Sequence, residues 1–392
     1  MTALLVARIS NSVICFDNAV ESSDWESVRK PRRKAEPRPP TIKDMARRAG
    51  VSVATISRGL RDDPGISLLT RKRIKALAEK MSYTPSRWGA ALSSGRTRCI
   101  LFVVPYNPSE IPTSNLIYIQ ALEGASEELS AYGYSIEIVL EKSLRARKQN
   151  VLEAITNARV DGAIIVCVSV DDGLDRFKKF PVPVVVVNQT FKSKSVDFVV
   201  ADHRHGGFLA TEHLIKAGHV DIVHIGAPLR YHMSRERRAG YREALSAYGL
   251  SFDPLKTIEA LHTMQHGQAA VESLLRSGIK FTAIFSSSDV LSIGIIAALR
   301  RNGLRVPEDI SIASYDDEVV ATAMTPPLTS VRAPRHEMGK IAARMLLERI
   351  QSNPEAKGRV VELKTTLITR ETVVAPPGNK PNKLKAVGQT SV

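Results

Sequence analysis

Most of the chain alternates short runs of Val and Ile with amphipathic helical stretches, and this pattern limits the possible folds more than any other feature. The segments "CILFVVP" (99–105) and "ISIASYDD" (310–317) are typical of strands. The segments "ERRAGYREALSAYG" (236–249) and "LSIGIIAALRRNG" (291–303) have helical spacing. Continuous apolar runs alternating with helices indicate parallel sheets buried on both faces, hence an α/β fold. Residues 99–375 are too many for one ordinary sheet, so we expect two lobes.

Polar residues follow several of the expected strands. In parallel sheets ligands bind beyond the carboxyl ends of strands, and the gap between two lobes is a natural ligand site. The alternative is that each of these polar residues only caps the helix that follows it, which is the better expectation for any single one. The candidates are Asn188-Gln189, Ser288-Asp289, Asp316-Asp317 and Arg237, which we expect to open the helix "RERRAGY".

The segment ahead of this region has a different character because it is strongly basic. Residues 41–98 hold thirteen Lys and Arg against four acids, so most of the chain's net charge of +15 lies there. Such a concentrated surplus predicts a surface for a polyanion, of which nucleic acid is the commonest; a solvated charged face is the alternative. Residues 1–40, which are basic and Pro-rich, and the tail 376–392 are expected to be disordered.

Two short helices are predicted at the start of the basic segment. Thr41 can cap the first helix with Asp44 completing a capping box, Gly50 allows a left-handed turn, and Ser52 can cap the second helix. The second helix then begins with small side chains and carries Arg58 a turn later. A slim start lets the backbone approach a major groove, where arginine can pair with guanine. An ordinary helical hairpin is the alternative.

The segments "TIKDMARRAGVSVATISRGL" (41–60) and "TRKRIKALAEKMSYTPSRWGAAL" (70–92) resemble the headpiece of the LacI/GalR family of transcription regulators. The resemblance implies a helix-turn-helix domain over 41–85 and a hinge over 86–98. Gly59 and Gly89 depart from the family pattern. By position, base contacts fall on Val53, Ala54 and Arg58, phosphate contacts on Thr55, Ser57, Ser67 and Thr70, and a minor-groove wedge on Leu92, which could instead be a plain linker leucine.

The resemblance extends to about residue 373, through stretches such as "ATEHLIKAGHVDIVHIGAP" and "RNGLRVPEDISIASYDD". It implies a two-lobed core like the type I periplasmic binding proteins. Asn188 and Ser288 stand where sugar-responsive members often carry Asp and Asn, and His262 could be a plain loop residue instead of a ligand contact. The implied effector contacts are Tyr118, Asn188, Arg237, His262, Ser288 and Asp316.

No catalytic signature is present in the sequence. It holds no G-x-S-x-G, no P-loop and no G-x-G-x-x-G after a strand, and its histidines lack metal-ligand spacing apart from a weak signal at His203 and His205. We therefore expect no enzyme, no cofactor and no metal. No run is long and apolar enough for a membrane span, and no secretory signal is visible, so a cytoplasmic protein is expected.

Together these features predict a transcriptional repressor that binds a palindromic double-stranded operator. A homodimer is expected because paired heads fit a two-fold site, with a tetramer as the alternative. The effector is expected to be a small carbohydrate or a derivative of one. Two rival classes remain open: a transport-associated sugar-binding protein, which leaves residues 41–92 without a role, and an α/β enzyme, which lacks a visible nucleophile and base.

Overall fold

The computed structural model describes residues 40–83, 96–105, 118–141, 160–166, 181–191, 196–351 and 357–376. The chain divides into two compact units, with the boundary between Thr97 and Arg98. The expected N-terminal extension up to residue 39, the hinge residues 86–95 and the tail from 377 onward lie outside the described residues.

Over residues 40–83 the smaller unit forms three helices, α1 (Ile42–Ala49), α2 (Val53–Leu60) and α3 (Leu68–Lys80). Thr41 and Asp44 form the predicted capping box at the start of α1, and Gly50 has the predicted left-handed backbone with φ 68°. The predicted cap Ser52 accepts a hydrogen bond from the Thr55 amide at 3.0 Å. Buried side chains, Met45 and Ile56 among them, join the helices in one small core.

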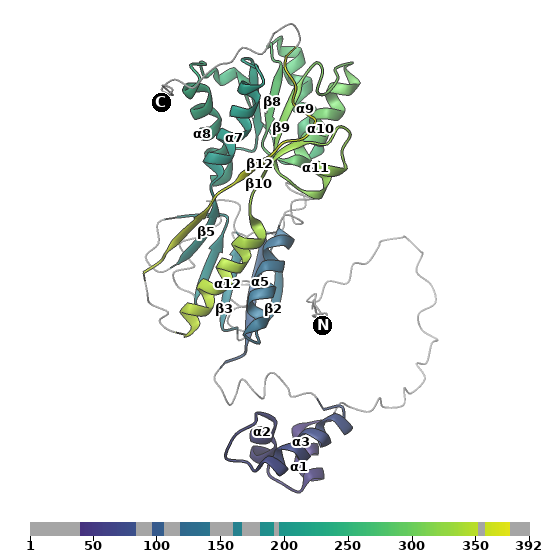
Figure 1. Ribbon diagram of the computed structural model, residues 1–392, viewed down its shortest axis with the longest axis vertical. Coiled ribbons are helices and arrows are strands. Elements are labelled where there is room, and N and C mark those ends of the chain that lie inside the picture. The colour runs from purple at the N-terminus through teal and green to yellow at the C-terminus, as the bar shows by residue number, and fades with distance from the viewer. Residues whose placement is uncertain are drawn as a thin grey trace, which may run out of the picture. The chain divides into compact units, whose positions relative to one another are not determined.

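The described part of the larger unit forms two six-stranded sheets, which confirms the expected two lobes (Figure 1). The first sheet has the order β11-β5-β4-β3-β1-β2 and is parallel throughout. The second has the order β12-β10-β9-β8-β6-β7, with only β12 antiparallel to its neighbour. The strands are β1 (Cys99–Pro105), β2 (Ser135–Glu141), β3 (Gly162–Val166), β4 (Val184–Val187), β5 (Asp197–Ala201), β6 (Ile222–Gly226), β7 (Thr257–Glu259), β8 (Ala283–Ser286), β9 (Ser311–Asp316), β10 (Thr329–Arg332), β11 (Val360–Leu363) and β12 (Thr366–Ile368).

Helices cover both sheets. In the first lobe α5 (Ile119–Ala131) packs against α12 (Arg335–Gln351), which also lies on β3, β4 and β5. In the second lobe α7 packs on α8, and α9 packs on α10. The second-lobe helices are α7 (His203–Lys216), α8 (His232–Ala247), α9 (Met264–Ser277), α10 (Asp289–Arg301) and α11 (Val319–Ala323), with a 3-10 turn η4 (Pro254–Lys256). No helix in the described part of the chain combines the length and apolar character needed to cross a membrane.

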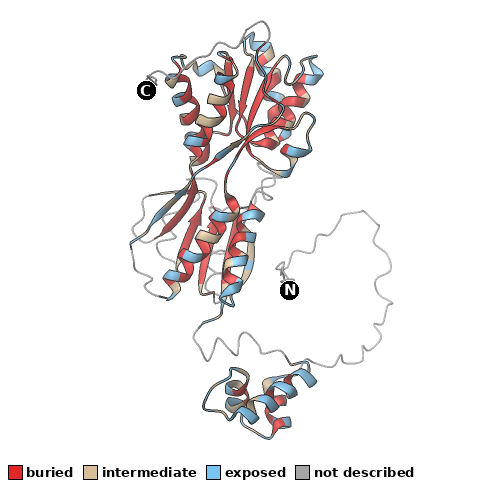
Figure 2. Cartoon of the chain, in the orientation of Figure 1, coloured by how far each residue is buried: buried red, intermediate tan, exposed pale blue. Residues whose placement is uncertain are grey.

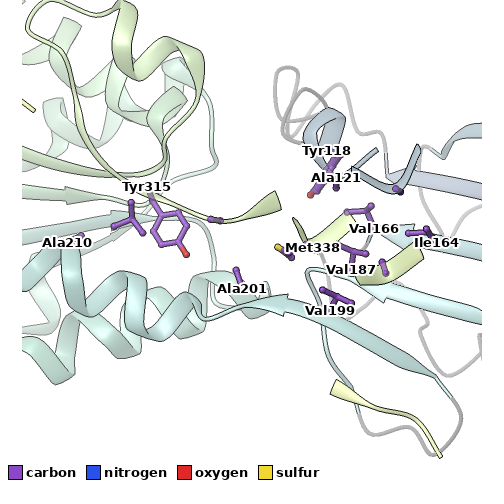
Figure 3. Close-up of a cluster of buried hydrophobic side chains, with 14 of the residues drawn as sticks. Tyr118, Ala121, Ile164, Val166, Val187, Val199, Ala201, Ala210, Tyr315 and Met338 are labelled. Carbon is purple, nitrogen blue, oxygen red and sulfur yellow. The ribbon is translucent and has the colours of Figure 1, made fainter. Parts of the chain in front are cut away.

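The chain crosses between the lobes three times: from β5 to α7, from β10 to α12, and from β11 to β12. Buried residues occupy both sheets (Figure 2). One hydrophobic cluster runs from first-lobe residues such as Val187 through Ala201 and Met338, near the crossings, to Tyr315 in the second lobe (Figure 3). The lobes are therefore joined by a shared apolar core as well as by three segments of chain.

Two glycines let α7 and α8 approach each other closely. A Cβ at Gly240 of α8 would lie 1.9 Å from the Arg204 carbonyl oxygen, and one at Gly207 of α7 would lie 2.2 Å from the Arg237 carbonyl oxygen. The neighbouring atoms are backbone, so neither contact can be relieved by a side-chain rotation. The glycines thus fix how α7, which begins at His203, sits on α8, which carries Arg237.

Gly240→Ala should lower the free energy of unfolding by about 1–3 kcal/mol because the added methyl group must push the two helix backbones apart. Urea unfolding of the full chain measures the change. Ser246→Ala, on an exposed position of the same helix, is the matched control and should leave the unfolding midpoint nearly unchanged. Equal stability of the two variants would contradict the close approach.

Candidate nucleic-acid interface and small-molecule site

Helix α2 presents the predicted base-contacting residues at its surface. Val53 is 40% exposed, and Ala54 and Arg58 are also exposed, whereas Thr55 and Ser57 are half-buried. Among the described residues the Arg58 guanidinium forms an ion pair only with Asp63, at 3.9 Å, and its side chain is 61% exposed. Such a loose, exposed ion pair contributes little to stability, so Arg58 can leave it for another partner.

Three of the predicted phosphate-contacting hydroxyls, those of Thr55, Ser67 and Thr70, lie at the starts of α2 and α3, whereas Ser57 lies in the middle of α2. Ser52 and Thr55 lie 2.9 Å apart through their hydroxyl oxygens, and Ser67 and Thr70 form the same pair at 2.8 Å. In each pair the first serine caps its helix by accepting a backbone N–H. Hydroxyls beside the amino end of a helix are suited to an anion. Leu92, the predicted minor-groove residue, lies outside the described residues.

Gly59, which departs from the family pattern, is explained by packing. It is buried where α2 meets α3, and a Cβ there would lie 2.4 Å from the Ile74 side chain. A larger residue at this position would require the Ile74 side chain to move. The glycine therefore keeps the end of α2 close to α3.

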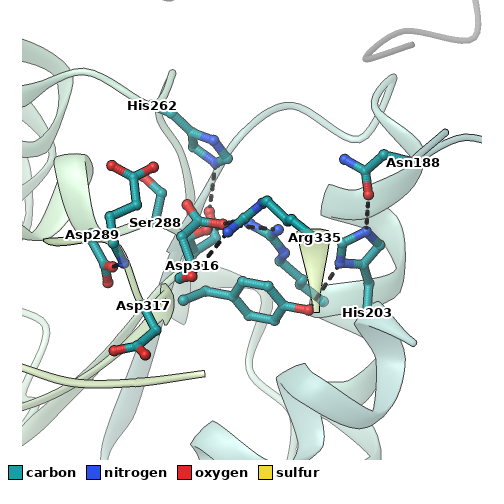
Figure 4. Close-up of polar contacts among 12 residues, drawn as sticks. Asn188, His203, His262, Ser288, Asp289, Asp316, Asp317 and Arg335 are labelled. Carbon is teal, nitrogen blue, oxygen red and sulfur yellow. Dashed lines mark hydrogen bonds and ion pairs between the residues drawn. The ribbon is translucent and has the colours of Figure 1, made fainter. Parts of the chain in front are cut away.

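In the larger unit, the carboxylate of Asp316 lies between two buried arginines (Figure 4). Arg335 reaches Asp316 Oδ1 at 2.5 Å and its backbone oxygen at 3.0 Å. Arg237 reaches the same Oδ1 at 3.4 Å, donates to the Ser287 carbonyl oxygen at 2.5 Å, and stacks 3.6 Å from the centre of the Tyr315 ring. The structure thus brings together the predicted residues Arg237 and Asp316.

The prediction that Arg237 begins its helix was wrong. Helix α8 begins at His232, so Arg237 lies in its second turn.

His262 and Ser288 lie beside this cluster. His262 Nε2 is 2.9 Å from the hydroxyl of Ser287, the residue whose carbonyl binds Arg237. Burial, with a further contribution from Arg237, lowers the pKa of His262 to about 4, so its ring is neutral at pH 7. Ser288 caps α10 by accepting the Leu291 amide at 3.2 Å, which is the helix-capping role that the sequence left open for it.

Asp289 and Asp317, which adjoin Ser288 and Asp316 in the sequence, bind framework residues, that is, residues of the second lobe outside the predicted site. Asp317 pairs with Arg332 at 2.7 Å and with Arg370 at 2.6 Å. Asp289 is fully buried and accepts hydrogen bonds from the Ser330 hydroxyl and the Glu318 amide. Burial and the neighbouring Asp316 raise the pKa of Asp289 to about 7, and the same two causes raise the pKa of Glu318 to about 7.

Asn188 joins this region through His203. Its Oδ1 atom is 2.8 Å from His203 Nε2, and His203 Nδ1 is 2.9 Å from the Tyr315 hydroxyl. Asp316 has a φ angle of 112°, which is strained for a residue other than glycine, and such strain often marks functional sites. Asn188 has a φ angle of 65°, in the left-handed region that asparagine adopts more readily than most residues. Among the described residues no group of three or more His, Cys, Asp or Glu is placed to hold a metal ion.

Tyr118 is placed at the N-cap of α5 and is buried in the hydrophobic cluster of Figure 3, with Ala121 nearby.

The sequence did not single out three residues around Asp316 as effector contacts: His203, Tyr315 and Arg335. Their local signal is a position beside a strand end, which they share with many structural residues. Their place beside Asp316 and Arg237 depends on contacts between segments far apart in the chain.

Known proteins share both parts of this chain. Residues 41–86 match the model of bacterial regulatory proteins of the lacI family, and residues 211–373 match the periplasmic binding protein-like domain. The ribose operon repressor of Haemophilus influenzae is 30% identical over 333 residues, which cover 85% of this chain and 98% of that protein. The chain belongs to the LacI family.

Solved structures of LacI-family regulators agree with this assignment. A complex of the transcriptional regulator CelR with cellobiose is 30% identical, with a TM-score of 0.66, covering 85% of this chain and 99% of that one. The lac repressor dimer bound to operator and the anti-inducer ONPF is 25% identical, with a TM-score of 0.75, covering 86% and 100%. The chain is therefore a DNA-binding transcriptional regulator and not an enzyme or a transport protein.

Asp289 gives the stability a distinct pH dependence. Its pKa is about 7 in the folded chain against an ordinary value of 3.8, so the folded state binds the extra proton between these values. The free energy of unfolding should therefore lose a contribution from this group as the pH rises from about 4 to about 7. Asp289→Asn should remove this decrease in the free energy of unfolding, because asparagine does not titrate.

Urea unfolding of both proteins across this pH range measures the effect. The difference in unfolding free energy between variant and wild type should shift in favour of the variant as the pH rises. A difference that stays constant with pH would show that Asp289 is already ionised at the lower end of the range.

Proposed function

We propose that this LacI-family regulator is a repressor that binds a two-fold operator as a homodimer. In this proposal residues 41–85 form the reading head, 86–98 the hinge and 99–375 the effector-binding core. The observation that carries it is the exposed start of α2, where Val53 and Ala54 are followed by the loosely paired Arg58 on a basic three-helix unit. A single head offers few phosphate contacts, so paired heads on a palindrome are needed for specific binding.

In this proposal the reading head makes two kinds of contact with DNA. Val53, Ala54 and Arg58 face base edges in the major groove, while the hydroxyls of the helix starts hold phosphates. Leu92 wedges into the minor groove from the hinge. Because the partner is chromosomal DNA, the protein acts in the cytoplasm. The proposed phosphate contacts are Thr55, Ser57, Ser67 and Thr70.

The effector in this proposal is a sugar or a sugar derivative bound where the lobes join. Relatives bear names that refer to ribose and cellobiose, which favours this class. The Arg237–Asp316 pair supplies charged donors and acceptors suited to hydroxyl groups, and the neutral ring of His262 supplies a flat surface. The proposed contacts are Tyr118, Asn188, Arg237, His262, Ser288 and Asp316.

Effector binding regulates DNA binding through its different affinity for two arrangements of the lobes. Asp316 of β9 is tied to Arg335, the first residue of the first-lobe helix α12, so a ligand on Asp316 acts on both lobes at once. Coupling of this kind is typically worth about 1–3 kcal/mol between effector and DNA.

Arg58→Ala should weaken binding to the preferred operator by about 1–3 kcal/mol while leaving binding to unrelated DNA much less changed, because a base contact is lost. Arg58→Lys is the matched control, since it keeps the charge but not the bidentate geometry. Its affinity for unrelated DNA and its salt dependence should remain those of the wild type, while operator preference falls. Gel-shift titrations with an operator and a scrambled duplex measure both quantities. Equal losses on both duplexes would remove Arg58 from base recognition.

Arg237→Met should reduce the response of operator binding to effector by at least about tenfold in effector concentration, which corresponds to about 1.4 kcal/mol. The variant keeps Asp316 paired through Arg335, so the core should remain folded. The measurement is a gel shift with titrated ribose, cellobiose and their oxidised derivatives, beside a melting curve of the variant. A folded variant with the wild-type dose–response would exclude Arg237 from the effector site.

A further inference from the structure

His203 occupies a special position between the two lobes. It is the first residue of α7, immediately after the crossing from β5, and it is 2% exposed. One ring nitrogen contacts Asn188 at the end of a first-lobe strand, and the other contacts Tyr315 in the second-lobe sheet (Figure 4). Asn188 is one of the proposed effector contacts, whereas His203, which binds it, has no role in the proposal so far.

The hydrogen bonds of Tyr315 determine which nitrogen of His203 carries the proton. The ring is neutral because burial, helped by Arg237, holds the pKa of His203 well below its usual value, so one nitrogen donates and the other accepts. The buried Tyr315 hydroxyl has its hydrogen bond to His203 Nδ1, and the Arg237 guanidinium stacked on the phenol ring can only donate. The phenol proton therefore needs Nδ1 as its acceptor, which leaves the histidine proton on Nε2.

This tautomer fixes the orientation of the Asn188 amide. Nε2–H of His203 donates to Asn188 Oδ1, so that oxygen is engaged. Figure 4 shows the amide nitrogen of Asn188 directed away from His203, toward the side where His262 lies. Asn188 thus offers two N–H donors there, whereas an aspartate at the same position would offer only acceptors.

A second buried donor lies in the same cluster. The Nε–H group of Arg237 has no hydrogen-bond partner among the described residues, although the side chain is only 2% exposed. A buried donor without a partner is costly, and a ligand atom that accepts a hydrogen bond would satisfy it. A ligand atom that accepts hydrogen bonds would satisfy the N–H donors of both Asn188 and Arg237.

We propose that His203 is a positioning residue that turns the Asn188 amide donors toward the ligand, so that the site prefers a sugar acid over the corresponding neutral sugar. This rests on the proposed effector site. The carboxylate of an aldonate or uronate accepts from Asn188 and Arg237, and the sugar hydroxyls bind toward Asp316. A hydroxymethyl group in place of the carboxylate accepts fewer of these bonds and carries no charge.

The tautomer can be tested on the ligand-free full chain by nitrogen-15 NMR of histidine-labelled protein. The signals of His203, assigned by their loss in His203→Gln, should show a protonated Nε2 and a bare Nδ1, unchanged between about pH 5.5 and 8. A protonated Nδ1, or a ring that titrates in this range, would overturn the proposal whatever the ligand proves to be.

The ligand class is tested by thermal shift with matched pairs: ribose and ribonate, glucose and glucuronate, galactose and galacturonate. At least one acid should stabilise the wild type more than its neutral partner, by about tenfold in affinity. Asn188→Asp should reverse that preference, because its carboxylate repels the acid. His203→Gln, which keeps a donor toward Asn188, should retain most of the preference, and His203→Leu should lose it.

Three other outcomes would contradict parts of the proposal. Greater stabilisation by the neutral sugars, or no shift with any acid, would overturn the preference for sugar acids. Equal effects of His203→Gln and His203→Leu would reduce His203 to a packing residue. Gel shifts of the same preparations without ligand report on DNA binding separately, so failure of the proposed regulatory function would be recognised independently.

Discussion

The carboxylate of Asp316, bound by Arg335 and Arg237, is the interaction on which the arrangement of the two lobes depends. Asp316 ends β9 in the second-lobe sheet, and Arg335 begins α12, which packs on the first-lobe strands. All three side chains are buried, so removal of Asp316 would leave two buried arginines without their shared carboxylate, at a cost of about 3–5 kcal/mol. Removal of either arginine alone leaves Asp316 paired with the other one. The strained backbone of Asp316, with φ 112°, is held because both its carboxylate and its carbonyl bind Arg335.

A continuous line of contacts connects this clamp to the first-lobe sheet. Asn188 contacts His203, His203 contacts Tyr315, and the Tyr315 ring carries the guanidinium of Arg237. Arg237 then contacts Asp316, which returns to the first lobe through Arg335. The line passes through two of the three chain crossings, the starts of α7 and α12. A ligand at either end would therefore change contacts that both lobes share.

The sequence predicted what local chemistry determines. The Val and Ile runs became buried strands, and Thr41, Gly50 and Ser52 took the predicted capping roles, because these depend only on neighbours in the chain. The strands β5, β10, β11 and β12 were not singled out, although they carry the crossings. They have three to five residues each, and polar or charged residues occur in all four, so they lack the continuous apolar run that marks the predicted strands. The partners His203 and Tyr315 are 112 positions apart, so no local pattern could have joined them.

The acids at strand ends show why the site itself was harder to predict than the fold. Asp316 and Asp317 are adjacent and of one residue type, yet Asp317 binds the framework arginines Arg332 and Arg370 while Asp316 binds Arg237 and Arg335. Only the direction of each side chain separates these roles.

Ligand choice depends on the direction of a side chain in the same way. Asparagine and aspartate have nearly the same shape, but they differ in whether they can donate hydrogen bonds at all. In the proposed site, His203 at the start of α7 determines which atom of the Asn188 amide faces the ligand. Under the proposed role of His203, two proteins with this scaffold and the same asparagine can present different amide atoms to a ligand through a residue that never touches it.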